Sequence, residues 1–328
     1  MRNMRWMIVR KAFNSFITIV LVVIMNFFLF RVIPGDPLAN LRGNTRVTDE
    51  YKEEFIKEFG LDQPTYVQFV KYVENVFTFD FGNAITQPLT PAMDIILGNL
   101  QWTLILTGTS SIFMIVIGMS LGVLSAWKRG SMLDTGTMAF SLFFYAMPTF
   151  WFAMMLIILF STGVICDCFP SGRALASGTT LEFTLESIKD MLWRLVLPAT
   201  SLTVGSIAAF SVIMRGALMD VMTEEYITTA RAKGLKESQV LRGHAVPNAM
   251  LPMVALIAID LAFVVGGAFQ TEVVFDYPGV GWLTVYATEQ LDYPLLEGCF
   301  FLIALVVVIA NFFADILLIY MDPRVKME

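Results

Sequence analysis

Charged side chains are scarce in this sequence. Asp, Glu, Lys and Arg make up 15% of its 328 residues, whereas hydrophobic residue types make up 56%. An average soluble domain carries about 25% charged residues. The composition therefore excludes an ordinary soluble domain and indicates an integral membrane protein. The net charge of −6 says little more, because the charges of a membrane protein are sorted by side of the membrane.

Histidine and cysteine are almost absent. The one histidine is His244, and the three cysteines are Cys166, Cys168 and Cys299. Cys166 and Cys168 are too close in sequence to favour a mutual disulfide. We expect unpaired thiols, with a bridge from either one to Cys299 as the alternative. A Cys-x-Cys pair without further ligands does not predict a metal site.

Patterns that carry chemistry are missing too. No GxxxxGK[ST] sequence occurs, so the chain is not expected to hydrolyse ATP itself. A membrane-embedded enzyme would need paired acids or a nucleophile motif beside the single histidine, and none is present. A secondary transporter would need coupling-ion groups and usually an internal repeat, but the sequence shows one mid-span carboxylate and no repeat.

What the sequence does contain is hydrophobic stretches of membrane-spanning length. A hydrocarbon core of about 30 Å requires about 20 apolar residues per helix. Gly118-x-x-x-Gly122 in the second stretch permits close approach of another helix. The first stretch is expected to be a retained helix, because no small-x-small cleavage site follows it. The predicted spans are Phe13–Val32, Thr103–Trp127, Thr135–Ser161, Pro198–Leu218, Met250–Gln270 and Cys299–Tyr320.

Lys and Arg residues indicate the orientation. They are more numerous on the side that holds both termini and the segment Thr223–Pro252, and basic short loops mark the cytoplasm. Both termini are therefore predicted to be cytoplasmic. We expect an N-terminal tail with the first helix over 1–33, an extracytoplasmic segment over 34–98 and a five-helix core over 99–328. A helix is predicted at Asp49–Phe59, where apolar residues recur every fourth position.

The segment Thr223–Pro252 is polar and basic between two apolar runs. Glu224–Lys233 contains good helix formers and no Gly or Pro, and Gly234 can take the left-handed conformation that ends a helix. A second helix is predicted from about Lys236 to Ala245. Two short helices that meet at a bend are therefore expected, before Pro247 and Pro252 at the start of the next span.

This segment resembles the cytoplasmic coupling loop of ABC importer permeases, through YITTARAKGL and HAVPNAMLP. Where the general motif has Glu-Ala-Ala, this chain has Thr228, Thr229 and Ala230, a departure often seen in the peptide and nickel branch of the family. Further stretches resemble the B-type permease of peptide importers in the same order. They are PGDP at 34–37, GLDQP at 60–64, DFG at 80–82, Asp134 with AMPTF at 146–150, the stretch from Thr271 to Gly281, DYP at 292–294 and DPR at 322–324.

The resemblance implies an all-α integral membrane fold of six transmembrane helices, the type I importer permease with a MetI-like core. It implies that the loop 223–247 forms a coupling helix in a cleft of an ATPase subunit. It also implies a second, related permease chain, two ATPase subunits that bind ATP and Mg²⁺, and an extracytoplasmic binding protein, all at a bacterial inner membrane. The chain itself would contact lipid and carry no catalytic residue, no cofactor and no nucleic acid. The residues expected to contact the ATPase are Glu225, Tyr226, Ala230, Lys233, Gly234, Leu235, His244, Asn248 and Pro252.

Three residues are candidates for the translocation path: Pro148, Asp260 and Glu272. Proline in mid-span frees a backbone carbonyl and suits a helix that lines a moving path. A mid-span carboxylate is costly in lipid, so Asp260 should line the path, pair with a neighbouring helix or, least favoured, relay protons. The loop after the fifth span carries Glu272, Asp276, Glu289 and Asp292 without Lys or Arg, which predicts an acidic mouth or a solvated rim.

The substrate implied by the resemblance is a peptide, whose amino terminus would suit Asp260. Nickel and glutathione importers share the same B-type pattern and remain alternatives. The absence of histidine along the spans leaves nickel without obvious ligands in this chain.

Overall fold

The computed structural model describes residues 2–32, 53, 56–57, 62–176, 184–263 and 268–321. Within these ranges the chain is helical apart from loops and one β-bridge between Asn83 and Pro91. The predicted helix at Asp49–Phe59 lies almost wholly outside the described residues, as do the PGDP stretch at 34–37 and DPR at 322–324.

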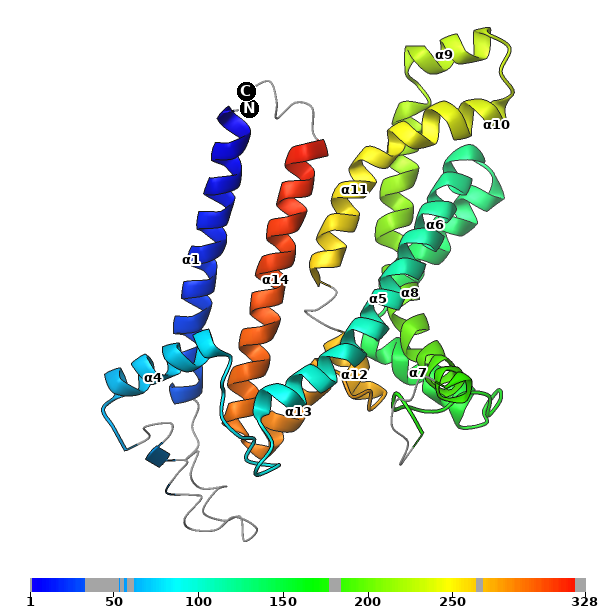
Figure 1. Ribbon diagram of the computed structural model, residues 1–328. Coiled ribbons are helices and arrows are strands. Elements are labelled where there is room, and N and C mark those ends of the chain that lie inside the picture. The colour runs from blue at the N-terminus through cyan, green and yellow to red at the C-terminus, as the bar shows by residue number, and fades with distance from the viewer. Residues whose placement is uncertain are drawn as a thin grey trace.

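The helices form a bundle whose long members run between two ends (Figure 1). One end carries the start of α1, the end of α14 and the α9–α10 pair, and the other carries α4, α12 and α13. The bounds are α1 Arg2–Val32, α4 Thr65–Thr78, α5 Ala92–Trp127, α6 Met132–Tyr145, α7 Thr149–Ser161, α8 Leu185–Val221, α9 Glu225–Ala232, α10 Glu237–Val240, a π-helix η1 Leu241–Ala245, α11 Val246–Phe263, α12 Phe269–Val274, α13 Val280–Gln290 and α14 Tyr293–Met321.

In the described residues the six predicted spans are helical, except at 146–148 in the third span and at Ala268 in the fifth. Five helices are long and apolar enough to cross a membrane, and α6 with α7 forms a sixth span if the bent pair is counted as one. Several helices begin earlier than predicted: α5 starts at Ala92 and α8 at Leu185. Their first turns include a charged residue, Asp94 in α5 and Glu186 in α8, and a count of apolar residues detects only the part of a helix that hydrocarbon surrounds.

The third span is broken where a kink was predicted. The axes of α6 and α7 differ by 100°. Pro148 precedes the first turn of α7 and lacks a backbone N–H, and its ring would clash with the carbonyl four residues earlier if the helix continued. Its own carbonyl accepts the Phe152 N–H at 3.1 Å, so a new helix begins instead.

Helices α5 and α8 pack closely along the bundle. A β-carbon added to Gly118 would lie 2.7 Å from the Phe210 β-carbon, and one added to Gly122 would lie 2.6 Å from the Ser211 carbonyl oxygen. The Gly118-x-x-x-Gly122 pair therefore allows the two backbones to approach, as the sequence predicted.

The cysteine prediction is wrong. Cys166 and Cys168 form a disulfide, and Cys299 is a free, buried thiol. The chain turns back on the end of α7 here: the Cys166 N–H donates to the Leu159 carbonyl and the Cys168 N–H to the Phe160 carbonyl. This turn leaves the two α-carbons 5.3 Å apart, a separation that a disulfide spans.

The prediction of an acidic mouth is also wrong for two of its carboxylates, since Glu272 and Asp292 are fully buried. Glu272 accepts hydrogen bonds from the Gly281 N–H (2.8 Å), the Trp282 N–H (3.1 Å) and the Thr103 hydroxyl (2.8 Å). It thereby caps the start of α13 and ties it to α5. Burial raises the pKa of the Glu272 carboxyl, and these hydrogen bonds oppose that rise.

Asp292 caps the start of α14 in a similar way. It accepts the Thr86 N–H at 2.8 Å, the Thr86 hydroxyl at 2.7 Å and the Leu295 N–H at 3.3 Å. Asp276, in contrast, is more than half exposed and pairs with Arg173, while Glu289 is exposed. Sequence alone did not distinguish the capping carboxylates from the surface ones.

We expect Gly122→Ala to destabilise the protein by about 1–3 kcal/mol, because the new methyl group overpacks the α5–α8 contact. Gly108→Ala is the matched control in the same helix, since an added β-carbon there meets no atom within 4 Å. The thermal unfolding midpoint in detergent measures both. Equal midpoints for the two variants would contradict the packing argument.

We expect Glu272→Ala to cost about 3 kcal/mol or more, because it leaves a buried N–H group, a partly buried N–H group and a buried hydroxyl without an acceptor. The control is Glu289→Ala, which removes an exposed carboxylate from α13 itself. A thermal midpoint for Glu272→Ala as high as that of the control would show that the cap contributes little.

Candidate functional site

The α9–α10 pair forms a compact element at the end of the bundle that carries the two terminal helices (Figure 1). Helix α9 ends near Lys233, and Gly234 adopts a left-handed φ of +80° that reverses the chain into α10. The predicted bend at Gly234 is therefore confirmed. The Arg231 guanidinium and the Glu237 carboxylate pair across the bend at 2.9 Å and 3.3 Å, and the Gln239 side chain accepts the Lys236 N–H at 2.9 Å.

One face of α9 is buried against the bundle. Ile227 and Ala230 lie three residues apart, on the same side of the helix, and are 0% and 5% exposed. They belong to a core cluster that includes Met214 and Leu218 of α8. The cluster continues through Val240, Leu241 and Ala245 into α11, so α9 packs in one cluster with residues of two membrane helices, α8 and α11.

The opposite face of the element is exposed. Among the predicted ATPase-contacting residues, Ala230 is buried and Leu235 is half-buried, so these two pack inside the element. The Tyr226 hydroxyl has a raised pKa, because burial and, to a smaller extent, Glu224 disfavour its ionised form. The exposed members are Glu225, Tyr226, Lys233, Gly234, His244, Asn248 and Pro252.

The second helix of this element does not stop at Ala245 as predicted. It passes through the π-helix η1 straight into α11, whose residues include Pro247 and Pro252. Pro247 has no N–H for the carbonyl four residues before it, and a π-turn is one way to accommodate such a gap. The Asn248 side-chain amide donates to the His244 carbonyl at 2.6 Å and so satisfies a carbonyl at this junction.

A partly buried ion pair, in which Asp134 is buried and Arg215 is partly exposed, lies near the α9 end of the bundle. The Arg215 Nε and Nη2 donate to the two Asp134 oxygens at 2.8 Å and 3.0 Å, and the Gly130 N–H donates to Oδ2 at 2.9 Å. The Ser125 hydroxyl also donates to Asp134. Asp134 is 5% exposed, and its partners come from α5, the α5–α6 turn and α8. From the sequence, Asp134 was part of a family pattern, and Arg215 was only one of the basic residues that indicate membrane orientation. Nothing in their spacing predicts that the two side chains form a pair.

Two of the residues predicted to line the translocation path, Pro148 and Asp260, belong to different helical segments. Pro148 lies at the break between α6 and α7. Asp260 is half-buried in α11, with Ser111 of α5 as a hydrogen-bonding neighbour, and its Oδ2 is shielded from solvent without a partner in the described part of the chain. A half-satisfied carboxylate of this kind needs a polar group or water, which agrees with either path lining or helix pairing.

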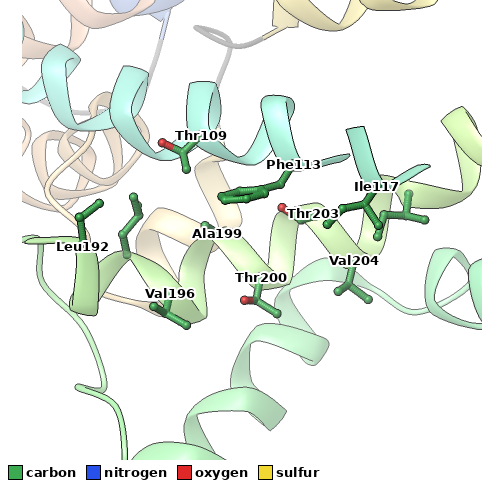
Figure 2. A pocket seen from close by; sticks show the side chains of 11 residues that line it. Thr109, Phe113, Ile117, Leu192, Val196, Ala199, Thr200, Thr203 and Val204 are labelled. Carbon is green, nitrogen blue, oxygen red and sulfur yellow. The ribbon is translucent and has the colours of Figure 1, made fainter. Parts of the chain in front are cut away.

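A groove that the sequence did not indicate runs between α5 and α8. Its volume is about 420 Å³, and Figure 2 shows Phe113 of α5 over the α8 residues Ala199 and Thr203. Leu192, Val196 and Val204 extend the α8 wall, and Thr109 and Thr200 add hydroxyl groups. These walls can contact an uncharged, mainly apolar group, but they offer it no ionic partner.

No group of three or more His, Cys, Asp or Glu side chains in the described ranges is arranged to hold a metal ion. The α9 end combines an exposed polar face, a buried apolar face and two short helices joined by a bend.

Comparison with known families gives this geometry a context. Residues 114–327 match the family described as "Binding-protein-dependent transport system inner membrane component", and residues 4–98 match its N-terminal companion. Among solved structures, the fold is similar to a chain of the inward-facing MetNI methionine ABC transporter, with a TM-score of 0.54 and 20% identity. That match covers 70% of this chain and 97% of the other.

Curated relatives align over nearly their whole length. The oligopeptide transport system permease protein AppB of Bacillus subtilis is 34% identical over 319 residues, covering 97% of this chain and 98% of that protein. The dipeptide transport system permease protein DppB of Escherichia coli K12 is 31% identical over 323 residues, covering 94% and 95%. The chain therefore belongs to the family of binding-protein-dependent transport system inner membrane components and has the MetI-like permease fold.

Proposed function

We propose that this chain is a membrane-spanning permease subunit of an ATP-driven importer of peptides. The observation that carries the proposal is the end-to-end similarity to permeases whose names specify oligopeptide and dipeptide transport. The pairing of an exposed, bent two-helix element with membrane helices supports it, because such an importer needs a surface on which its ATPase can push.

The α9–α10 element is the proposed contact with an ATPase subunit. Glu225, Tyr226 and Lys233 lie on its exposed face, and His244 and Asn248 extend that face toward α11. The side chains of Ile227 and Ala230 lie on the opposite, buried face of α9, in a cluster with residues of α8 and η1. This end, with both chain termini, would face the cytoplasm of a bacterial inner membrane, and ATP and Mg²⁺ would bind to two separate ATPase subunits.

The remaining partners follow from the same proposal. A second permease chain would complete the membrane part, and an extracytoplasmic binding protein would deliver the peptide to the end that carries α4, α12 and α13. Closure of the ATPase dimer would displace α9, and α8 and α11 would follow it through the cluster around Ile227. Only contacts that differ between the two states can drive this change.

Peptide selectivity tests the function directly. In a reconstituted complex, we expect a binding protein loaded with a dipeptide or a longer peptide to stimulate ATP hydrolysis, and one offered Ni²⁺ to leave it at the basal rate. Phosphate release measures both. Stimulation by Ni²⁺ and by no peptide would contradict the proposed substrate.

A substitution at the bend tests the coupling element. We expect Gly234→Val to leave assembly intact but reduce peptide-stimulated ATP hydrolysis, because a β-branched residue strains the left-handed backbone and reorients α9 against α10. Gly163→Val is the matched control, since Gly163 has a φ of +83° in the loop after α7, at the other end of the bundle. Equal stimulation in the two variants would show that the bend at Gly234 is dispensable.

A further inference from the structure

The path from α9 into the membrane helices begins on α8. Ile227 of α9 packs in the cluster that contains Met214 and Leu218, the residues on either side of Arg215 along α8. Helix α8 ends at Val221 and α9 begins at Glu225, so the two helices are also joined by a short connection. Any displacement of α9 therefore reaches the segment of α8 that holds Arg215.

The Asp134–Arg215 pair links that segment of α8 to α6. Two donors of one guanidinium meet both oxygens of one carboxylate, which fixes the relative orientation of the groups as well as their distance. Ser125 of α5 and the Gly130 N–H occupy the remaining acceptor sites of Asp134. Because Asp134 is buried, separating it from Arg215 would leave an uncompensated charge, so separation of the pair is costly.

A second contact also joins α6 to α8. It lies two turns from Asp134 along α6 and one turn from Arg215 along α8. The Ser211 hydroxyl of α8 donates to the Ser141 hydroxyl of α6 at 3.2 Å, and both residues are fully buried. The Ser211 carbonyl meanwhile lies against Gly122 of α5. Helix α8 is thus held on one side by α5 and on the other by α6, at two levels.

Helix α6 leads directly to the break at Pro148 and then to α7, which packs against α8 and α12. The other route out of α9 runs through α10 and η1 into α11 and does not involve Asp134. Two routes therefore leave α9, and the ion pair belongs to one of them.

We propose that the Asp134–Arg215 ion pair is the joint through which movement of α9 reaches α6, so that the ends of α5, α6 and α8 move as one body during transport. Asp134 and Arg215 are then positioning residues of the importer. This inference rests on the proposed function, because it assumes that an ATPase moves α9.

Spin-label distances test the joint in the assembled complex. Three exposed positions serve as labelling sites after substitution by cysteine: Met132 on α6, Thr223 beside α9 and Leu317 on α14. The native cysteines do not compete, since Cys166 and Cys168 are paired and Cys299 is buried. When ATP and vanadate trap the complex, we expect the 132–317 distance to change and the 132–223 distance to stay constant.

The decisive variant is Asp134→Asn with Arg215→Gln, which removes both charges and leaves neither one unpaired. We expect the 223–317 distance still to change, because α9 still pushes α8. The change in the 132–317 distance should be clearly smaller than in the wild type, since only the Ser141–Ser211 hydrogen bond and apolar packing then hold α6 to α8. The matched control is Lys11→Gln with Asp315→Asn, which removes an ion pair of 2.8 Å between α1 and α14 outside this route. A full 132–317 change in the Asp134 and Arg215 variant would overturn the proposal.

Transport gives a second readout that a purely structural role would not move. We expect the number of peptides imported per ATP hydrolysed to fall about tenfold in the Asp134 and Arg215 variant and to stay within about twofold in the Lys11 and Asp315 control. If the double variant fails to assemble, Asp134→Asn alone is judged by the same distances, since asparagine is isosteric with aspartate and its one remaining oxygen can still accept from either Gly130 or Ser125. If an assembled variant imports as many peptides per ATP hydrolysed as the wild type, the proposal that this ion pair is the joint is overturned.

The two proposals fail in distinguishable ways. Should the substrate be something other than a peptide, peptide-loaded binding protein will not stimulate ATP hydrolysis, yet nucleotide trapping will still report on the distances. Should the joint be wrong, peptides will stimulate ATP hydrolysis and drive import in the variant as in the wild type.

Discussion

The structure depends on one constraint: within hydrocarbon, every backbone polar group must be paired inside the protein. Long helices satisfy it along α1, α5, α8 and α14, and close contact between α5 and α8 then becomes possible because glycine at 118 and 122 lets the backbones approach. Packing of this kind between smooth apolar helices does not by itself determine how they are oriented. A small set of buried polar contacts supplies that information.

Three of the four carboxylate or amide side chains that make these contacts lie where helices begin, and the fourth, Asn26, lies inside α1. Glu272 caps α13, Asp292 caps α14, Asp134 lies in the first turn of α6, and Asn26 of α1 donates to the Tyr72 hydroxyl and to the Glu297 carbonyl. Each one joins segments that are distant in sequence. Four acidic or amide side chains in a chain with few charges therefore determine much of how its apolar helices are placed.

The sequence predicted the helical class, the six spans, the bend at Gly234 and the position of the third-span break, because hydropathy, glycine and proline act locally. It could not assign Glu272, Asp292 or Arg215, since the partners of each come from other helices and an acidic residue in a loop has the same composition whether buried or exposed. The disulfide was missed for a related reason: sequence spacing does not reveal that the chain folds back on the end of α7. The groove between α5 and α8 could not be predicted from the sequence, because its walls consist mainly of apolar residues like those of any membrane helix.

The Cys166–Cys168 disulfide also bears on the compartment at each end of the bundle. It follows α7, at the end opposite to α9 (Figure 1). Disulfides persist where thiols are not kept reduced, as in the bacterial periplasm and outside cells. An oxidised pair at that end agrees with the proposal that α9 faces the reducing cytoplasm. Redox chemistry thus supports the same orientation as the distribution of Lys and Arg, through residues that carry no charge at all.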